Sequence, residues 1–151
     1  MLEIKNVHKT FNKGTINEKK ALNGVDLKLA PGDFVTIIGG NGAGKSTMLN
    51  MIAGVYPIDQ GTILLDGKDI SDLPEYKRAY MLGRVFQDPM MGTAAGMEIQ
   101  ENMAMANRRG KRRGLNWGIS KKEKKMFKEK LATLDLGLED RMTSKVGLLS
   151  G

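Results

Sequence analysis

Apolar and polar residues alternate through the first part of the chain. Residues 21–30 place apolar side chains between polar ones, which predicts a strand with one buried face; the apolar residues are Leu22, Val25, Leu27 and Leu29. Pro31-Gly32-Asp33 predicts a turn after this strand. Phe34–Ile38 is a short run rich in β-branched residues and bounded by glycine, which predicts a buried strand. We therefore expect residues 1–38 to consist of strands and turns.

The middle of the chain changes from a strand pattern to a helical one and back. Residues 45–53 have helical periodicity, and Gly54 is suited to the left-handed position that ends a helix. Asp66-Gly67 predicts the turn of a β-hairpin between two apolar stretches. A further short strand is expected within residues 79–88.

The last third of the chain is predicted to be helical. Ser120 and Glu123 have the spacing of a capping box at the start of a helix within residues 118–137. Four apolar side chains in this segment and directly after it fall on one helical face: Phe127, Leu131, Leu134 and Leu138. The composition shifts near Pro89, from a β-rich part with many glycines to a methionine-rich, basic and helical part. We therefore predict two domains, residues 1–88 and 89–151.

The composition restricts the possible classes of protein. The chain has no cysteine, which excludes disulfides and thiolate metal sites. Its first ten residues lack an apolar run, so we expect no secretory signal there. Apolar runs are far shorter than a membrane span, so any role at a membrane would depend on a partner.

The net charge of +7 is concentrated in one segment. Residues 108–130 hold eleven Lys and Arg against two Glu, a local charge of +9. One interpretation is a solvated helix face. A second is contact with a membrane partner or an anionic lipid surface, to which Trp117 would be suited. A third is non-specific nucleic-acid binding, but no known nucleic-acid-binding module accompanies the charges, so no specific nucleic acid is expected.

The nine residues GGNGAGKST form the clearest motif. They fit the pattern G-x-x-x-x-G-K-S/T, with an apolar run before them and a helical pattern after them. Glycines let the backbone turn tightly, so that successive N–H groups and a helix N-terminus converge on phosphate oxygens. A glycine-rich turn that matches by chance is the alternative. The motif predicts a nucleotide-binding site at Gly39, Gly40, Asn41, Gly42, Ala43, Gly44, Lys45, Ser46 and Thr47.

Each polar side chain of this motif has an expected role. The N–H groups of residues 41–46 would point inward as an anion nest. Lys45 would reach the β- and γ-phosphates, Ser46 would offer its hydroxyl to Mg²⁺, and Thr47 would bond near the α-phosphate. The motif alone does not distinguish kinases, GTPases, motors and transport ATPases. The stretch NKGT at residues 12–15 lacks the aspartate of the base-reading motif of GTPases.

Further features occur with this motif in a definite order. Phe11 lies 28 positions before Gly39, Gln87 follows an apolar run, and the chain closes with Leu149-Ser150-Gly151. With the stretch from Pro57 to Gly67, they resemble the ATP-binding cassette (ABC) family along the whole chain. The resemblance implies that Phe11 stacks on adenine and that Gln87 contacts Mg²⁺ and the attacking water.

Ser150 and Gly151 would belong to the signature L-S-G-G-Q, which in this family caps the γ-phosphate held by a second cassette. The resemblance implies an α/β fold: a P-loop core of the ABC type with an N-terminal antiparallel β-subdomain, followed by the start of a helical subdomain. It also implies ATP and Mg²⁺ as cofactors, with Lys45 and Gln87 catalytic and Ser46 and Gln87 near the metal.

The partners implied are a membrane permease and a second cassette, identical or different, at the cytoplasmic face of the membrane. The function implied is ATP-driven transport, with an uptake system favoured by the QDPMMGTA stretch and the long basic insert. One alternative is a soluble ABC ATPase that acts on ribosomes or DNA. Another is a nucleotide-binding fragment without catalysis.

The signature is interrupted after its third residue. In the family, the rest of the signature, a strand ending in Asp-Glu and a switch histidine would follow; His8, the only histidine, lies too early to be that switch. We therefore expect this chain alone to turn over no ATP. We also expect the Phe34–Ile38 strand to lack its neighbour in the core sheet and to present unpaired backbone.

Overall fold

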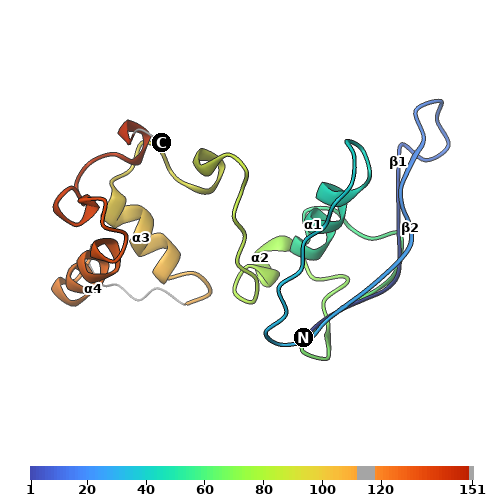
Figure 1. Cartoon of the computed structure of the whole chain (residues 1–151), viewed down its shortest axis with the longest axis horizontal. Coiled ribbons are helices and arrows are strands. Elements are labelled where there is room, and N and C mark those ends of the chain that lie inside the picture. Colours follow the sequence, from blue (N-terminus) through green and yellow to red (C-terminus); the bar gives the residue numbers. More distant parts are fainter. Residues whose placement is uncertain (112–117, 150–151) are drawn as a thin grey trace. The chain divides into compact units, whose positions relative to one another are not determined.

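The computed structural model describes residues 1–111 and 118–149 in two compact units, Met1–Leu82 and Gly83–Gly151 (Figure 1). Ser150, Gly151 and Trp117 lie outside the described residues. The predicted assignment of residues 1–88 and 89–151 to a nucleotide-binding core and a helical subdomain stays a prediction.

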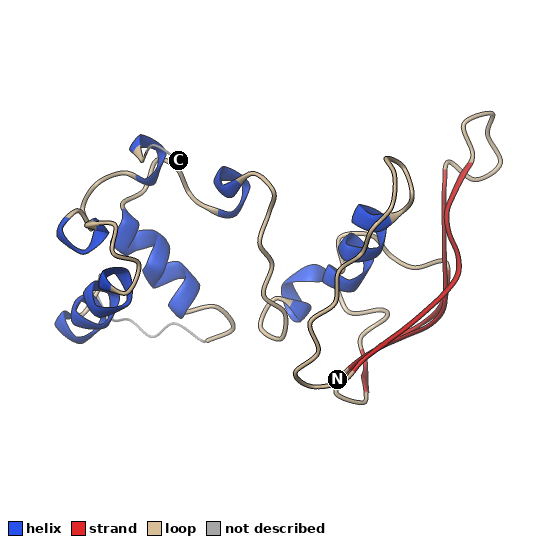
Figure 2. Ribbon diagram, viewed as in Figure 1, coloured by secondary structure: helices blue, strands red, loops and turns tan. Residues whose placement is uncertain are grey.

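The first unit contains one antiparallel sheet in the order β2-β1-β3-β4 (Figure 2). Its strands are β1 (Leu2–Phe11), β2 (Lys19–Leu29), β3 (Gln60–Leu65) and β4 (Lys68–Asp69). In the β1–β2 ladder, apolar residues of the two strands face each other, as in the pairs Ile4↔Leu27 and Val7↔Val25. The sheet confirms the predicted N-terminal antiparallel strands.

Helix α1 (Lys45–Ala53) packs on this sheet. Its buried side chains are Met48 and Met51. They join a single apolar cluster with Ile4, Val7, Leu22, Ile63 and Ile70 from the sheet and its edges. Burial of these side chains is the main favourable contribution to the folding of the unit.

The predicted turns are present. Gly54 ends α1 with φ 86°, in the left-handed region that glycine adopts without steric cost. Asp66 and Gly67 join β3 to β4 with φ 49° and 77°, as a two-residue hairpin turn requires. At the predicted turn after β2, the Asp33 carboxylate accepts a hydrogen bond from the Ala30 N–H at 2.7 Å.

A buried arginine connects helix α1 to the segment after β4. Arg78, the last residue of α2 (Glu75–Arg78), is 2% exposed. Its guanidinium donates to the Met51 and Ile52 carbonyls at the end of α1, at 2.7 and 3.0 Å. It also donates to the Leu73 and Ser71 carbonyls, at 2.7 and 2.8 Å. Burial lowers the Arg78 pKa, and the charges of Asp72 and Asp69 oppose that shift.

The second unit is helical. It contains α3 (Ile99–Asn107), α4 (Lys121–Ala132) and three short 3₁₀ turns at Pro89–Gly92, Leu138–Asp140 and Val146–Leu148. Among the described residues of this unit, the buried apolar side chains are Ile99 and Ala104 of α3 and Phe127 and Leu131 of α4. None of the helices in the described residues is long and apolar enough to cross a membrane.

The predicted capping box of α4 is present and extends to α3. The Ser120 hydroxyl accepts from the Glu123 N–H at 3.2 Å, and Glu123 accepts from the Ser120 N–H at 2.8 Å. Arg108, which follows α3, donates to both Glu123 carboxylate oxygens at 3.0 Å. The Ser120 hydrogen bonds, with Arg108, lower the pKa of Glu123 to about 2. This cluster links the end of α3 to the start of α4.

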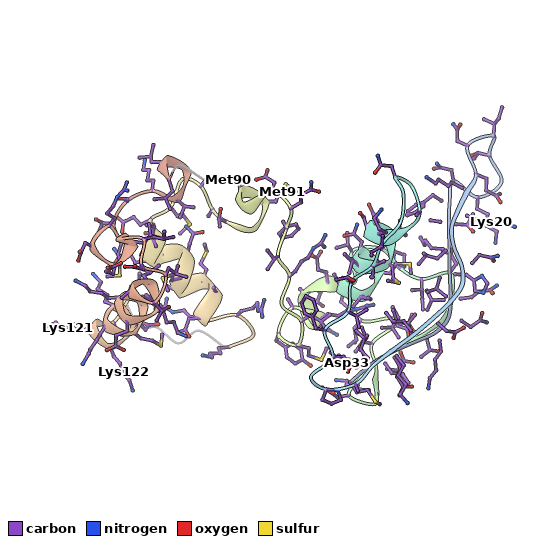
Figure 3. The ribbon with its side chains drawn as sticks, in the orientation of Figure 1. Lys20, Asp33, Met90, Met91, Lys121 and Lys122 are labelled. Atoms are coloured by element: carbon purple, nitrogen blue, oxygen red, sulfur yellow. The ribbon has the colours of Figure 1, made fainter. Side chains whose placement is uncertain are left out.

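The basic segment is mostly exposed where it is described. Arg108 pairs with Glu123, and Lys128 pairs with Asp140 at 3.0 Å. Lys121 and Lys122 extend from the first turn of α4 into solvent (Figure 3). The solvated, membrane-partner and nucleic-acid interpretations of this segment all stay predictions.

Three expectations about secondary structure were wrong. Phe34–Ile38 forms no strand, and Phe34 and Ile38 are 93% and 92% exposed, since no other described segment pairs with this stretch. Residues 79–88 also form no strand. Leu134 was expected on the apolar face of this helix, but it is exposed, because α4 ends two residues earlier, at Ala132.

The Arg78 contacts lead to a stability prediction. Arg78→Met keeps the apolar stem but removes four hydrogen bonds to buried and partly buried carbonyls, although the Met51 carbonyl still accepts from the Gly54 N–H. We therefore expect a loss of about 3 kcal/mol in the free energy of unfolding. Urea unfolding followed by circular dichroism measures it. Lys77→Met, at the exposed neighbouring position, is the matched control and should change stability by less than about 0.5 kcal/mol. Equal stability of the two variants would show that the Arg78 contacts contribute nothing.

Candidate functional site

The glycine-rich loop leads directly into helix α1. Gly44 is the N-cap residue of α1, with φ 87°, and the Met48 N–H donates to its carbonyl at 2.9 Å. Gly42 also has a positive φ, 82°, and the Ala43 N–H donates to the Gly40 carbonyl at 3.3 Å. Two of the three residues 42–44 are in the left-handed region, so the backbone of the loop turns sharply where the helix begins.

Close packing against strand β2 fixes the position of Gly44. A Cβ atom at Gly44 would lie 2.6 Å from the Ala21 carbonyl oxygen and 2.9 Å from the Leu22 Cδ2. No side chain fits there, so glycine is required both for its φ and for the close approach of the backbone. The start of α1 is therefore held against β2.

The N-terminus of α1 carries an uncompensated positive end. Its first turn contains no acidic residue. The first N–H groups of any α-helix lack intrahelical acceptors, and the helix dipole places partial positive charge there. Ser46 is exposed and Thr47 half-buried in this turn. The combination of free N–H groups, dipole and hydroxyls favours an anionic ligand.

Lys45 folds back over the loop. Its ammonium donates to the Gly39 carbonyl at 2.5 Å and to the Gly40 carbonyl at 2.7 Å. The side chain therefore lies along the loop that precedes the helix. A lysine held by two carbonyls can exchange them for phosphate oxygens without a change in backbone conformation.

Phe11 ends strand β1 in an aromatic pair. Its ring meets Tyr56 edge-on, with centroids 5.3 Å apart and an interplanar angle of 82°. The Lys9 ammonium lies 5.6 Å from the Phe11 centroid and is also paired with Asp59 at 2.8 Å. The Lys9 hydrogen bond, with one from the Thr10 N–H, lowers the pKa of Asp59. Sequence reasoning missed Tyr56, which no motif marked.

A second lysine lies beside the glycine-rich loop. Lys19 is the ladder partner of Phe11, and its ammonium lies 3.3 Å from the point that a Cβ atom on Gly42 would occupy. The end of β1, the start of β2 and the loop are thus neighbours within the first unit. Sequence reasoning missed Lys19, because only the β1–β2 register reveals its position.

The remaining predicted site residues fall in the second unit. Gln87 is exposed, and the Asp88 carboxylate after it accepts from the Met90 N–H at 2.9 Å. Ser150 and Gly151 lie outside the described residues. The turn before them is held by backbone bonds from Val146 and Gly147 to the Met97 and Ala95 carbonyls, at 3.0 and 2.9 Å. Gln87 and the glycine-rich loop belong to different units, so the predicted role of Gln87 stays a prediction.

Comparison with known proteins identifies the family. A family model described as "ABC transporter" matches residues 22–151. The tyrosine transport ATP-binding protein of Clostridioides difficile (strain R20291) is 38% identical over 151 residues, which cover 100% of this chain and 60% of that protein. The spermidine/putrescine import ATP-binding protein PotA of Haemophilus influenzae is 36% identical over 108 residues, 72% of this chain and 27% of that protein.

A solved structure agrees with these matches. The ATP-binding cassette MJ0796, in a dimeric post-hydrolysis state bound to ADP and Pi, has a TM-score of 0.79 and 30% identity, covering 99% of this chain and 63% of that chain. The chain therefore belongs to the ABC transporter family and has the fold of an ABC cassette, which confirms the predicted family and α/β fold class. The chain spans about three fifths of the length of the tyrosine transport protein.

The geometry of the loop leads to a matched pair of substitutions. Gly44→Ala forces a Cβ atom onto the Ala21 carbonyl at a positive φ, so we expect a loss of about 2 kcal/mol in the free energy of unfolding. Gly40→Ala is the control, since its Cβ atom would meet nothing within 4 Å. It should change stability by less than about 0.5 kcal/mol. Urea unfolding curves test both, and similar losses for the two variants would contradict the packing argument.

Proposed function

We propose that this chain forms part of the nucleotide-binding subunit of an ABC transporter and binds ATP with Mg²⁺ at Gly39–Thr47. The observation that carries the proposal is the glycine-rich loop held against β2 at the start of α1, in a chain of the ABC transporter family. The residues present suit a polyphosphate, because backbone donors, a helix N-terminus and an ammonium group lie together.

Each loop residue has a proposed part in binding. The N–H groups of residues 41–46 bind phosphate oxygens, and Thr47 bonds near the α-phosphate. Lys45 leaves the Gly39 and Gly40 carbonyls and binds the β- and γ-phosphates. The exposed Ser46 hydroxyl is a ligand for Mg²⁺. Phe11 stacks on the adenine ring, with Tyr56 supporting its edge.

Hydrolysis requires groups beyond the loop. Bound Mg²⁺ neutralises charge on the transferring phosphoryl group. Gln87 is proposed to contact the metal and orient the attacking water. Ser150 and Gly151 are proposed to cap the γ-phosphate of a second cassette. Phosphoryl transfer depends mainly on positioning and on charge stabilisation, so these residues contribute by fixing geometry.

The proposed partners are a second cassette and the subunits of a membrane permease. The dimeric MJ0796 cassette supports the first. Membership of the ABC transporter family and the transport function in the names of both relatives support the second. The word import in the name of the spermidine/putrescine relative supports uptake as the direction. We place the subunit on the cytoplasmic face of the membrane, as a peripheral protein. Tyrosine is the candidate substrate, because the tyrosine relative matches along the whole chain.

Nucleotide binding is the first test of this proposal. Titration of the chain with Mg·ATP, followed by isothermal calorimetry, should show saturable binding that Lys45→Ala weakens by about a hundredfold, because a charge-assisted bond to phosphate is lost. Lys68→Ala, at an exposed lysine of the same unit, is the control and should bind as the unmodified chain does. Equal binding by the two variants would exclude the loop as the nucleotide site.

Uptake is tested in cells that carry the gene for the whole subunit. Deletion of the gene should abolish ATP-dependent accumulation of labelled tyrosine, and the unmodified gene should restore it. The Lys45→Ala gene should fail to restore it, because phosphate binding at the loop drives the transport cycle. Accumulation that does not depend on the gene would exclude tyrosine uptake, and faster efflux from complemented cells would indicate export.

A further inference from the structure

The Lys19 ammonium lies at the outer side of the glycine-rich loop. It is 3.3 Å from the point that a Cβ atom on Gly42 would occupy. Lys19 is exposed, and within residues 1–111 and 118–149 its ammonium has no hydrogen-bond or ion-pair partner. The neighbouring acidic residue, Glu18, instead accepts a hydrogen bond from the Gly14 N–H at 2.8 Å.

Lys19 adds positive charge at the loop, and no carboxylate of the described residues pairs with its ammonium. Lys45 brings a second ammonium to the same loop, and the N-terminus of α1 adds its dipole without an acidic residue in the first turn. Positive groups at one loop attract an anion more strongly than a single one does. An anion at the loop would gain a contact with Lys19.

We propose that Lys19 is a binding residue for the α- and β-phosphates of the nucleotide; this inference rests on the function proposed above. Lys19 lies between the two ends of the proposed site, because it pairs with Phe11 in the β1–β2 ladder and its ammonium reaches Gly42. Residues paired in an antiparallel ladder have Cα atoms about 5 Å apart. A nucleotide whose base stacks on Phe11 and whose phosphates enter the loop therefore passes Lys19 with the phosphates nearest the ribose.

Lys20 provides a matched control in the next position of the same strand. It pairs with Thr10, and its side chain points away from the sheet into solvent (Figure 3). Successive side chains of a strand point to opposite faces, so the two lysines differ in position and share charge, length and strand propensity. Lys19→Arg is the conservative variant that keeps the charge.

The experiment measures the dissociation constants of Mg·ATP and Mg·ADP by isothermal calorimetry on the whole chain. Lys19→Met should raise both dissociation constants by about tenfold, because one charge-assisted contact is lost from each complex. Lys20→Met should leave both unchanged, and Lys19→Arg should restore binding to within about twofold. The difference in dissociation constant between Lys19→Met and the unmodified chain should become smaller as the salt concentration rises, because the contact is exposed. Urea unfolding midpoints of all variants confirm that they are folded.

The outcomes separate this inference from the proposed function. If the unmodified chain and all variants fail to bind, the proposed nucleotide site is wrong and the role of Lys19 is overturned with it. If the unmodified chain binds and Lys19→Met binds equally well, the role of Lys19 alone is overturned. A loss confined to Mg·ATP would place Lys19 at the γ-phosphate and overturn its assignment to the α- and β-phosphates.

Discussion

Helix α1 is held at both of its ends, and the geometry of the proposed nucleotide site depends on these two contacts. At the N-terminal end, Gly44 packs against the β2 backbone, where no Cβ atom fits. At the C-terminal end, the Arg78 guanidinium donates to two carbonyls of the helix. A cation there also complements the negative end of the helix dipole, since α1 has no basic residue in its last turn. The loop before α1 is thereby fixed relative to the sheet.

The burial of Arg78 has an energetic cost that the fold offsets locally. Desolvation disfavours a buried guanidinium, which is why its pKa is lowered. Four carbonyl acceptors, contributed by the end of α1 and by the segment before α2, satisfy its donors. An apolar side chain would avoid the desolvation cost but would remove the guanidinium donor from these carbonyls, of which only that of Met51 is known to keep another donor, the Gly54 N–H. The arginine therefore contributes by joining two segments that are distant in sequence.

Features set by local chemistry could be predicted from the sequence. The left-handed Gly54, the Asp66-Gly67 turn and the capping box of α4 each need only a few neighbouring residues, and each is present. The family resemblance predicted the N-terminal antiparallel sheet, but the register of its strands and the pairing of other segments could not be predicted. The apolar run Phe34–Ile38 has strand propensity, but a strand needs a partner, and no other described segment provides one. Lys19 was missed for the same reason, since its position depends on strand register.

The proposed site residues divide between the two units, and this division separates binding from turnover. The loop, Phe11 and Lys19 all belong to Met1–Leu82, and their mutual positions follow from one sheet and one helix. Gln87 belongs to the unit that begins at Gly83. Binding of a polyphosphate needs only donors that converge, which the first unit supplies. Hydrolysis needs a water placed to within a fraction of an ångström, so the proposed role of Gln87 depends on whatever fixes the second unit against the first.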